Sequence, residues 1–247
     1  MKGDLRAETI WLEGSSGDRI EAYLAEPLDQ RSTGAMVVIH HMPGYDEGTK
    51  EITRRVAAEG YLAICPNLYT REAPGASADD AAAAARASGG VPDDRLVGDV
   101  AGCLTYLRGL PQSNGKAGAI GYCSGGRQSF LAACSLPLQA AIDCYGAFVV
   151  GQPPEGFPLK VGPLTDLVDS LSCPLLGLFG EEDQHPSASE VKELDELLSG
   201  HGKPHEFHSY QGAGHAFFAV DRPSYRPEAA KDGWARIWKF LAVNLAA

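Results

Sequence analysis

Short apolar runs that alternate with helical patterns constrain the fold of this 247-residue chain more than any other feature. Residues 35–41 (AMVVIHH) and 61–66 (YLAICP) are continuous apolar runs of strand length, which is typical of strands covered on both faces. Between them, residues 48–60 (GTKEITRRVAAEG) follow a helical pattern and end at Gly60, a residue favoured just after a helix. A strand, a helix and a second strand in this order predict a parallel sheet.

The same alternation continues along the chain. Residues 19–27 alternate between apolar and polar side chains, as a half-buried strand does. Further strands are expected at 116–122, 139–146 and 174–180, and helices at 93–110, 124–136, 188–200 and 228–245. Residues 79–90 are alanine-rich and predict a surface helix or loop, and the Pro- and Gly-rich residues 151–163 predict an ordered loop near the strand ends. We expect one α/β domain over residues 1–247, with a doubly wound, mostly parallel sheet and helices on both faces.

Charge and cysteine usage limit the partners and the compartment. The formal net charge of −11 argues against nucleic acid and anionic membranes as partners. No apolar run is long enough to span a bilayer, and the first residues, MKGDLRAETIWLEG, lack the apolar stretch of a signal peptide. The six cysteines include no C-x-x-C pair. We therefore expect a cytoplasmic protein that binds a small molecule, as a monomer or a small homo-oligomer.

Residues 118–127 (GAIGYCSGGR) contain the candidate nucleophile. Gly121 and Gly125 flank Cys123 with the spacing of a nucleophile elbow in which cysteine replaces serine. The helix expected after Cys123 directs its N-terminal amides at the sulfur and favours a thiolate. The Ser124 backbone N–H then points where an oxyanion would form. The alternative is an inert buried thiol, which is our interpretation of four other cysteines: Cys65, Cys103, Cys134 and Cys144.

A candidate acid and a candidate base follow later strands. Asp183 ends the segment PLLGLFGEED, and His215 lies in YQGAGHAFF. Nucleophile, acid and histidine come in this order in α/β-hydrolases. Because ligands bind beyond the carboxyl ends of parallel strands, we expect these side chains to meet there. Glu181 and Glu182 remain alternatives for the acid, and a solvated turn or surface loop is the alternative for all of them.

Taken together, GYCSGG, GEEDQHP, GAGHAF and LYTREAPG resemble motifs of the dienelactone hydrolase (carboxymethylenebutenolidase) family. The resemblance extends from residue 19 to the last expected helix. It implies an α/β-hydrolase fold and a triad of Cys123, His215 and Asp183.

The resemblance also implies roles for four residues around that triad. Arg71 would bind a substrate carboxylate, and Tyr145 would lie near the pocket. The backbone N–H groups of Met42 and Ser124 would form the oxyanion hole. Without the resemblance, Arg71 would be interpreted as a solvated surface charge and Tyr145 as a core residue.

Two positions depart from the family pattern. His41, in HHMPG, stands where the family commonly has a glutamate near the resting cysteine. It is expected either to pair with a Cys123 thiolate or to be a polar pocket residue without a catalytic role. Ala219 stands where the family has a second arginine, and Arg222 is out of register. Dienelactone is therefore one candidate substrate among other lactones and activated esters.

The sequence thus predicts a hydrolase that cleaves lactones or activated esters through an acyl-cysteine intermediate, with no cofactor or metal. One alternative is a redox-sensing protein on a hydrolase scaffold, with Cys123 as the reactive thiol. A second alternative is a metal enzyme using His40, His41 and His215. Adjacent residues of a strand point to opposite faces, which argues against one ion bound by both His40 and His41.

Overall fold

The computed structural model describes residues 4–29 and 31–246. Eight strands form one sheet in the order β1-β2-β4-β3-β5-β6-β7-β8. β1 and β2 pair antiparallel, β2 and β4 also pair antiparallel, and every other neighbouring pair is parallel. The expected mostly parallel sheet is confirmed. The strands are β1 (Leu5–Glu13), β2 (Arg19–Pro27), β3 (Thr33–Ile39), β4 (Leu62–Pro66), β5 (Ser113–Tyr122), β6 (Ala140–Cys144), β7 (Leu175–Gly180) and β8 (His205–Tyr210).

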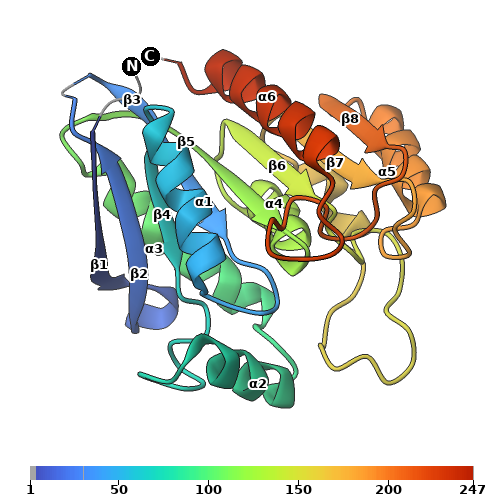
Figure 1. Ribbon diagram of the computed structural model, residues 1–247, viewed down its shortest axis with the longest axis horizontal. Helices are drawn as coiled ribbons and strands as arrows, with labels where there is room; N and C mark the ends of the chain where they lie inside the picture. Colours follow the sequence, from blue (N-terminus) through green and yellow to red (C-terminus); the bar gives the residue numbers. More distant parts are fainter. Residues whose placement is uncertain (1–3, 30, 247) are drawn as a thin grey trace.

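Helices cover both faces of the sheet. Buried side chains of α3, α4 and α5 belong to one apolar cluster, and those of α1 and α6 belong to another. Figure 1 shows α1 and α6 in front of the sheet and α3 and α4 behind it. The doubly wound arrangement is therefore as expected. The helices are α1 (Glu47–Ala58), α2 (Ala78–Ser88), α3 (Asp93–Arg108), α4 (Ser124–Ser135), α5 (Ala188–Gly200) and α6 (Pro227–Asn244), with short 3₁₀ turns at η1 (Ser15–Gly17) and η2 (Thr165–Ser170).

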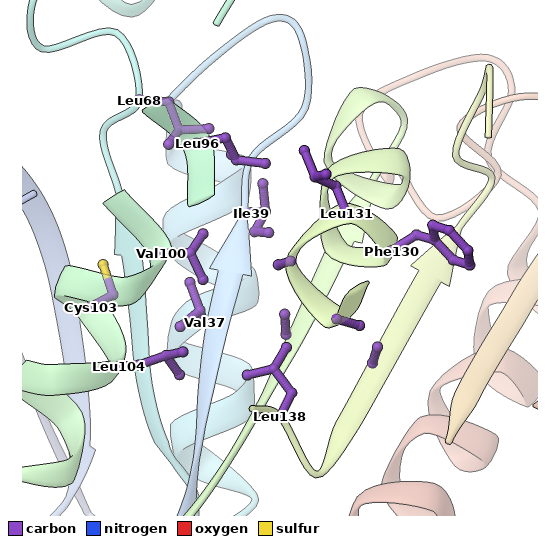
Figure 2. Close-up of a cluster of buried hydrophobic side chains, with 14 of the residues drawn as sticks. Val37, Ile39, Leu68, Leu96, Val100, Cys103, Leu104, Phe130, Leu131 and Leu138 are labelled. Atoms are coloured by element: carbon purple, nitrogen blue, oxygen red, sulfur yellow. The ribbon is translucent and has the colours of Figure 1, made fainter. Parts of the chain in front are cut away.

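The central strand β3 is apolar on both faces because helices cover both. Val37 and Ile39 project to the side of α3, whose Leu96, Val100 and Leu104 pack in the same cluster (Figure 2). The intervening residues, Met36 and Val38, belong to the cluster on the opposite face. The two-residue period of a strand divides this continuous apolar run between the two cores.

The strand order reverses at β3, which lies between β4 and β5. In open α/β sheets, the crevice beyond the carboxyl ends of the strands at such a reversal is the usual ligand site. Met42 follows β3 and Cys123 follows β5, on either side of this point. Asp183 follows β7, and His215 follows β8.

The alanine-rich segment and the Pro- and Gly-rich segment extend beyond this same edge of the sheet (Figure 1). The first forms helix α2, and residues 151–163 form a loop without helix or strand. The backbone N–H of Lys160 donates to the carbonyl of Gly89, just after α2, over 2.7 Å. This hydrogen bond ties the loop to the end of α2.

Two strands were not predicted, and both lie at edges of the sheet. β1 pairs only with β2, and β8 pairs only with β7. Most side chains of both strands are exposed or half-buried. An edge strand buries little, so neither segment shows the continuous apolar run that marks the inner strands.

Candidate active site

Cys123 occupies the sharp turn between β5 and α4. Its φ of 57° lies in a region that residues with side chains rarely adopt. The turn leaves no space for side chains on either flank. A Cβ on Gly121 would overlap the carbonyl oxygen of Gly125, and one on Gly125 would overlap the carbonyl oxygen of Ile39. The two glycines are therefore required by close packing, and Cys123 has the backbone geometry of a nucleophile elbow.

Three hydrogen-bond donors converge on the sulfur of Cys123: the imidazole of His215 and the backbone N–H groups of Ser124 and Met42. Burial alone would raise the pKa of this thiol. The hydrogen bond and charge of His215, together with the two amides, outweigh burial and lower the pKa below its usual value. The site therefore stabilises a thiolate.

The other five cysteines behave in the opposite way. All are buried, and burial raises the pKa of each thiol. This confirms the expected core placement of four of them and adds the fifth, Cys173. Cys123 is the one cysteine of the chain whose surroundings favour the reactive form.

Asp183 holds the imidazole of His215. The Nδ1 atom of His215 lies 2.8 Å from Oδ2 of Asp183, which is only 8 % exposed. Since a carboxylate accepts, Nδ1 donates and Nε2 is left for the sulfur of Cys123. Burial lowers the pKa of His215, but the hydrogen bonds to Asp183 and Cys123 raise it well above its usual value. Glu181 and Glu182 are exposed, so Asp183 is the acid that reaches the histidine.

His41 is paired with a carboxylate and is not among the residues that line the pocket. Its Nε2 atom lies 2.6 Å from Oδ2 of Asp46, and its side chain does not line the pocket described below. Asp46 is also the N-cap of α1, where it accepts from the N–H of Thr49. Burial raises the pKa of Asp46, but the contacts to His41 and Thr49 lower it below its usual value. The N-cap carboxylate thus fixes the ring of His41 outside the pocket wall.

Arg71, which was expected to bind a substrate carboxylate, is paired with two carboxylates of the chain itself. Its Nε atom lies 2.8 Å from Asp18, and its two terminal nitrogens lie 2.9 and 2.8 Å from the two oxygens of Asp99. Asp99 is fully buried, so its charge requires this bidentate partner. Arg71 does not line the pocket.

Tyr145 lies beside the site but behind His215. The two rings meet edge to face with centroids 5.1 Å apart, and Tyr145 is only 3 % exposed. Its ring also packs on Phe217. Tyr145 therefore lies near the pocket and supports His215, but its ring is not part of the pocket wall.

A pocket of about 490 Å³ opens over Cys123 and His215. Its wall is largely apolar, and much of it comes from the loop at 151–163 and from residues near it: Val91, Phe148, Phe157, Leu159 and Val161. This wall was not predicted. The available signal was the recurrence of Phe157, Leu159 and Val161 at every second position of a loop that would otherwise be polar.

The three histidines of the metal-enzyme alternative turn to separate partners. His40 binds the backbone of His41 and Leu68, His41 binds Asp46, and His215 binds Asp183. Within residues 4–29 and 31–246, no group of three or more His, Cys, Asp or Glu side chains is placed to hold one ion. No helix in this described part is long and apolar enough to cross a membrane.

Comparison with known proteins gives concordant results. The sequence model of the dienelactone hydrolase family matches residues 20–245. The chain is similar to the "Putative carboxymethylenebutenolidase" of Salmonella typhimurium, at 35% identity over 92% of this chain and 84% of the relative. The protein of the same name from Synechocystis is 29% identical over 92% and 93% of the two chains.

Among solved structures, the chain is similar to a "Putative Dienelactone Hydrolase" from Klebsiella pneumoniae. The TM-score is 0.84 and the identity 28%, over 97% of this chain and 99% of that one. Together with the sheet order, this likeness shows the expected α/β-hydrolase fold.

Proposed function

The chain belongs to the dienelactone hydrolase family and is a hydrolase, and from this premise we propose that it cleaves lactones or activated esters through an acyl-cysteine intermediate. Cys123 is the nucleophile, His215 the general acid and base, and Asp183 the residue that orients His215. The observation that carries the proposal is the hydrogen-bonded series from Asp183 through His215 to the sulfur of Cys123. Family membership favours turnover over the redox-sensing alternative.

Acylation begins with attack of the Cys123 thiolate on the substrate carbonyl carbon. Negative charge develops on the carbonyl oxygen as the C–S bond forms. The backbone N–H groups of Met42 and Ser124, which point at the sulfur in the resting site, are positioned to bind this oxyanion. The imidazolium of His215 then gives its proton to the leaving oxygen as the C–O bond breaks.

Deacylation uses the same groups in reverse. His215 is now neutral and removes a proton from water, which attacks the thioester carbonyl. The C–S bond breaks, the acid product leaves, and the proton on His215 restores the ion pair with Cys123. Asp183 keeps Nδ1 protonated in both half-reactions, so Nε2 always faces the reacting atoms.

The leaving group determines which substrates acylate the enzyme. A thiolate leaves a tetrahedral adduct more readily than a basic alkoxide does, so the adduct with an alkyl ester collapses back to substrate. Enolate and phenolate leaving groups reverse this preference. We therefore expect turnover of enol lactones and aryl esters to exceed that of ethyl esters.

The test is hydrolysis of dienelactone and of an aryl acetate by the wild type and by Cys123→Ala, with intact-mass detection of an acetyl adduct after rapid quenching. We expect the wild type to turn over at least the aryl ester and the variant neither substrate. If the wild type hydrolyses dienelactone and Cys123→Ala does not, dienelactone is a true candidate substrate. Full activity of Cys123→Ala would refute the proposal.

The remaining expectations follow the same proposal. The partner is a small ester or lactone, and the protein acts in the cytoplasm as a single domain over residues 1–247, as a monomer or a small homo-oligomer. None of the proposed steps requires a metal or a cofactor, because the chain itself supplies the nucleophile, the base and the oxyanion donors.

A further inference from the structure

We propose that the acyl part of the substrate is uncharged and apolar, so that esters or lactones carrying a second carboxylate are poor substrates. This inference rests on the proposed hydrolysis at Cys123 and names its substrate class. It follows from the apolar composition of the pocket wall and from the ion pairs that Arg127 and His215 already form there.

The wall is formed by packed apolar side chains. The rings of Phe148 and Phe157 meet edge to face with centroids 4.9 Å apart. Leu159 and Val161 continue the wall along the same loop, which the hydrogen bond from Lys160 to Gly89 holds in place. A wall of this kind stabilises hydrocarbon through burial and gives no hydrogen bond to a carboxylate.

The guanidinium on the wall is not free to bind an anion. Arg127 is only 3 % exposed, and its terminal nitrogens lie 2.8 and 2.9 Å from the two oxygens of Asp93. Its Nε atom and one terminal nitrogen also donate to the carbonyl of Gly162. Asp93 neutralises Arg127, and almost all of its donors are used.

The other charges near the sulfur oppose a second carboxylate. Glu182 and Asp183 both line the pocket, and the imidazolium of His215 is already paired with Asp183 and Cys123. Arg71 is held by Asp18 and Asp99 outside the pocket. Arg127 and His215, which line the pocket, are both already paired, so a substrate carboxylate would lose its hydration without a free partner in either of them, which disfavours binding.

The test compares two aryl esters with acyl chains of equal length. 4-Nitrophenyl pentanoate has a neutral end, and mono-4-nitrophenyl glutarate has a carboxylate at the same place. After correction for their hydroxide-catalysed rates, we expect kcat/KM at about pH 8 to favour the pentanoate by at least about tenfold, since an unpaired buried charge costs more than 1.4 kcal/mol. Equal or faster turnover of the glutarate would overturn the inference.

A charge-introducing variant tests the cause. Leu159→Arg places a guanidinium on the wall and is expected to lower the ratio of kcat/KM for the pentanoate to kcat/KM for the glutarate. Leu159→Met keeps a neutral side chain of similar size and should leave this ratio unchanged. An unchanged ratio in Leu159→Arg would refute the charge argument. Failure of the proposed function is a separate result, because it would show as pentanoate hydrolysis that survives Cys123→Ala.

The hydrogen bonds of a buried histidine carry a second, independent inference: the geometry points to His40 as a positioning residue for the oxyanion-binding N–H of Met42. His40 ends the apolar run of β3 and is only 2 % exposed. Its ring lies edge-on to Tyr69, with centroids 4.7 Å apart. It does not line the pocket, so it acts through the backbone.

Both ring nitrogens of His40 have fixed roles. The N–H of Leu68 lies 3.2 Å from Nε2, and because an N–H can only donate, Nε2 accepts. Nδ1 therefore carries the proton and donates to the carbonyl of His41 over 2.8 Å. Burial lowers the pKa of His40 to about 4, so the ring stays neutral near pH 7 and keeps this tautomer.

The carbonyl of His41 and the N–H of Met42 belong to one planar peptide unit. Fixing the oxygen therefore fixes the direction of the N–H, which points at Cys123. The N–H of Gly44 also donates to this oxygen over 2.9 Å. The hydroxyl of Tyr69 donates to the carbonyl of Met42 over 2.9 Å and holds the next peptide.

The test uses two variants of His40. His40→Leu removes the donor, and His40→Asn places an amide N–H near the position of Nδ1. With an aryl acetate, we expect His40→Leu to lower kcat about 10- to 100-fold, a smaller effect than removing an oxyanion donor completely would have. KM should change little. His40→Asn should recover much of kcat.

A second measurement separates positioning from a general loss of structure. The Met42 N–H also stabilises the thiolate, so the pH midpoint of iodoacetamide alkylation of Cys123 should rise in His40→Leu and return toward wild type in His40→Asn. Wild-type kcat in His40→Leu would overturn the inference. If His40→Leu does not fold, the folded His40→Asn variant is compared with the wild type, and a much lower kcat with an unchanged alkylation midpoint would overturn the inference, because the N–H of Met42 would then still be in place.

Discussion

Replacing Asp143 by asparagine should remove a pH dependence of stability that this buried carboxyl introduces. Asp143 lies near the end of β6 and is fully buried. Its Oδ1 atom accepts from the N–H of Gly146 over 2.7 Å, whereas Oδ2 has no hydrogen-bond partner in the described part of the chain. Burial raises the pKa of Asp143 to about 7, although the N–H of Gly146 acts in the opposite direction.

The sign of the effect follows from the two states. A folded pKa of about 7, against 3.8 for the ordinary carboxyl, means that the folded protein holds this proton more tightly than the unfolded chain. Below about pH 4 both states are protonated, and the group costs nothing. As the pH rises toward 7 the unfolded chain releases its proton first, so the free energy of unfolding falls.

The magnitude follows from the same two values. One pKa unit corresponds to about 1.4 kcal/mol, so the full cost above pH 7 is roughly 4 kcal/mol. Roughly 2 to 3 kcal/mol of it develops between pH 5 and 8. This is a large part of a total stability that is typically about 5 to 15 kcal/mol.

The assay is urea unfolding of the wild type and of Asp143→Asn at about pH 5 and pH 8. We expect the wild type to lose roughly 2 to 3 kcal/mol more than the variant between these pH values. The matched control is Glu155→Gln, which changes an exposed acid and should follow the wild type. Parallel pH profiles for the wild type and Asp143→Asn would refute the reasoning.

Further predictions concern the elbow, the triad and the core. Gly125→Ala should abolish esterase activity and lower the urea midpoint, because its Cβ would overlap the backbone of β3. Asp183→Asn should lower kcat for an aryl acetate roughly 10²- to 10⁴-fold, measured in initial-rate assays, because His215 loses the partner that sets its tautomer. Since His215 lowers the pKa of Cys123, His215→Gln should raise the pH midpoint of Cys123 alkylation by iodoacetamide. Phe130→Ala should cost about 3 to 5 kcal/mol in urea unfolding, since Phe130 is fully buried.

The meeting of Cys123, Asp183 and His215 could be predicted because it depends on topology. Cys123 and Asp183 each follow a predicted strand by a few positions, and all parallel strands of a sheet end at the same edge. The strand before His215 was not among those predicted, so His215 was recognised by the chain order of nucleophile, acid and histidine. The glycines around Cys123 add a local constraint that is visible in the sequence, since the turn excludes side chains there. No knowledge of long-range packing was needed for this part of the site.

The pocket wall could not be predicted in the same way. Phe157, Leu159 and Val161 lie on a loop whose path is fixed by contacts with distant segments, such as the hydrogen bond from Lys160 to Gly89. The edge strand β8 was missed for a related reason. Its sequence, HEFHSY, contains polar residues that find partners only in the folded protein, as His205 does with Asp195.

Arg71 shows how the contacts of a side chain can differ from those that a motif match implies. The position of Arg71 after β4 is set by the local chain, but the direction of its guanidinium is set by Asp99, which is distant in sequence and fully buried. If Arg71 turned to a substrate carboxylate, Asp99 would keep the N–H of Ser15 as a donor but lose its cation. Removing one partner of a buried ion pair costs about 3 to 5 kcal/mol. A substrate that recruited Arg71 must supply that energy in addition to the cost of its own desolvation, which is why the ion pair with Asp99 opposes a contact between Arg71 and substrate.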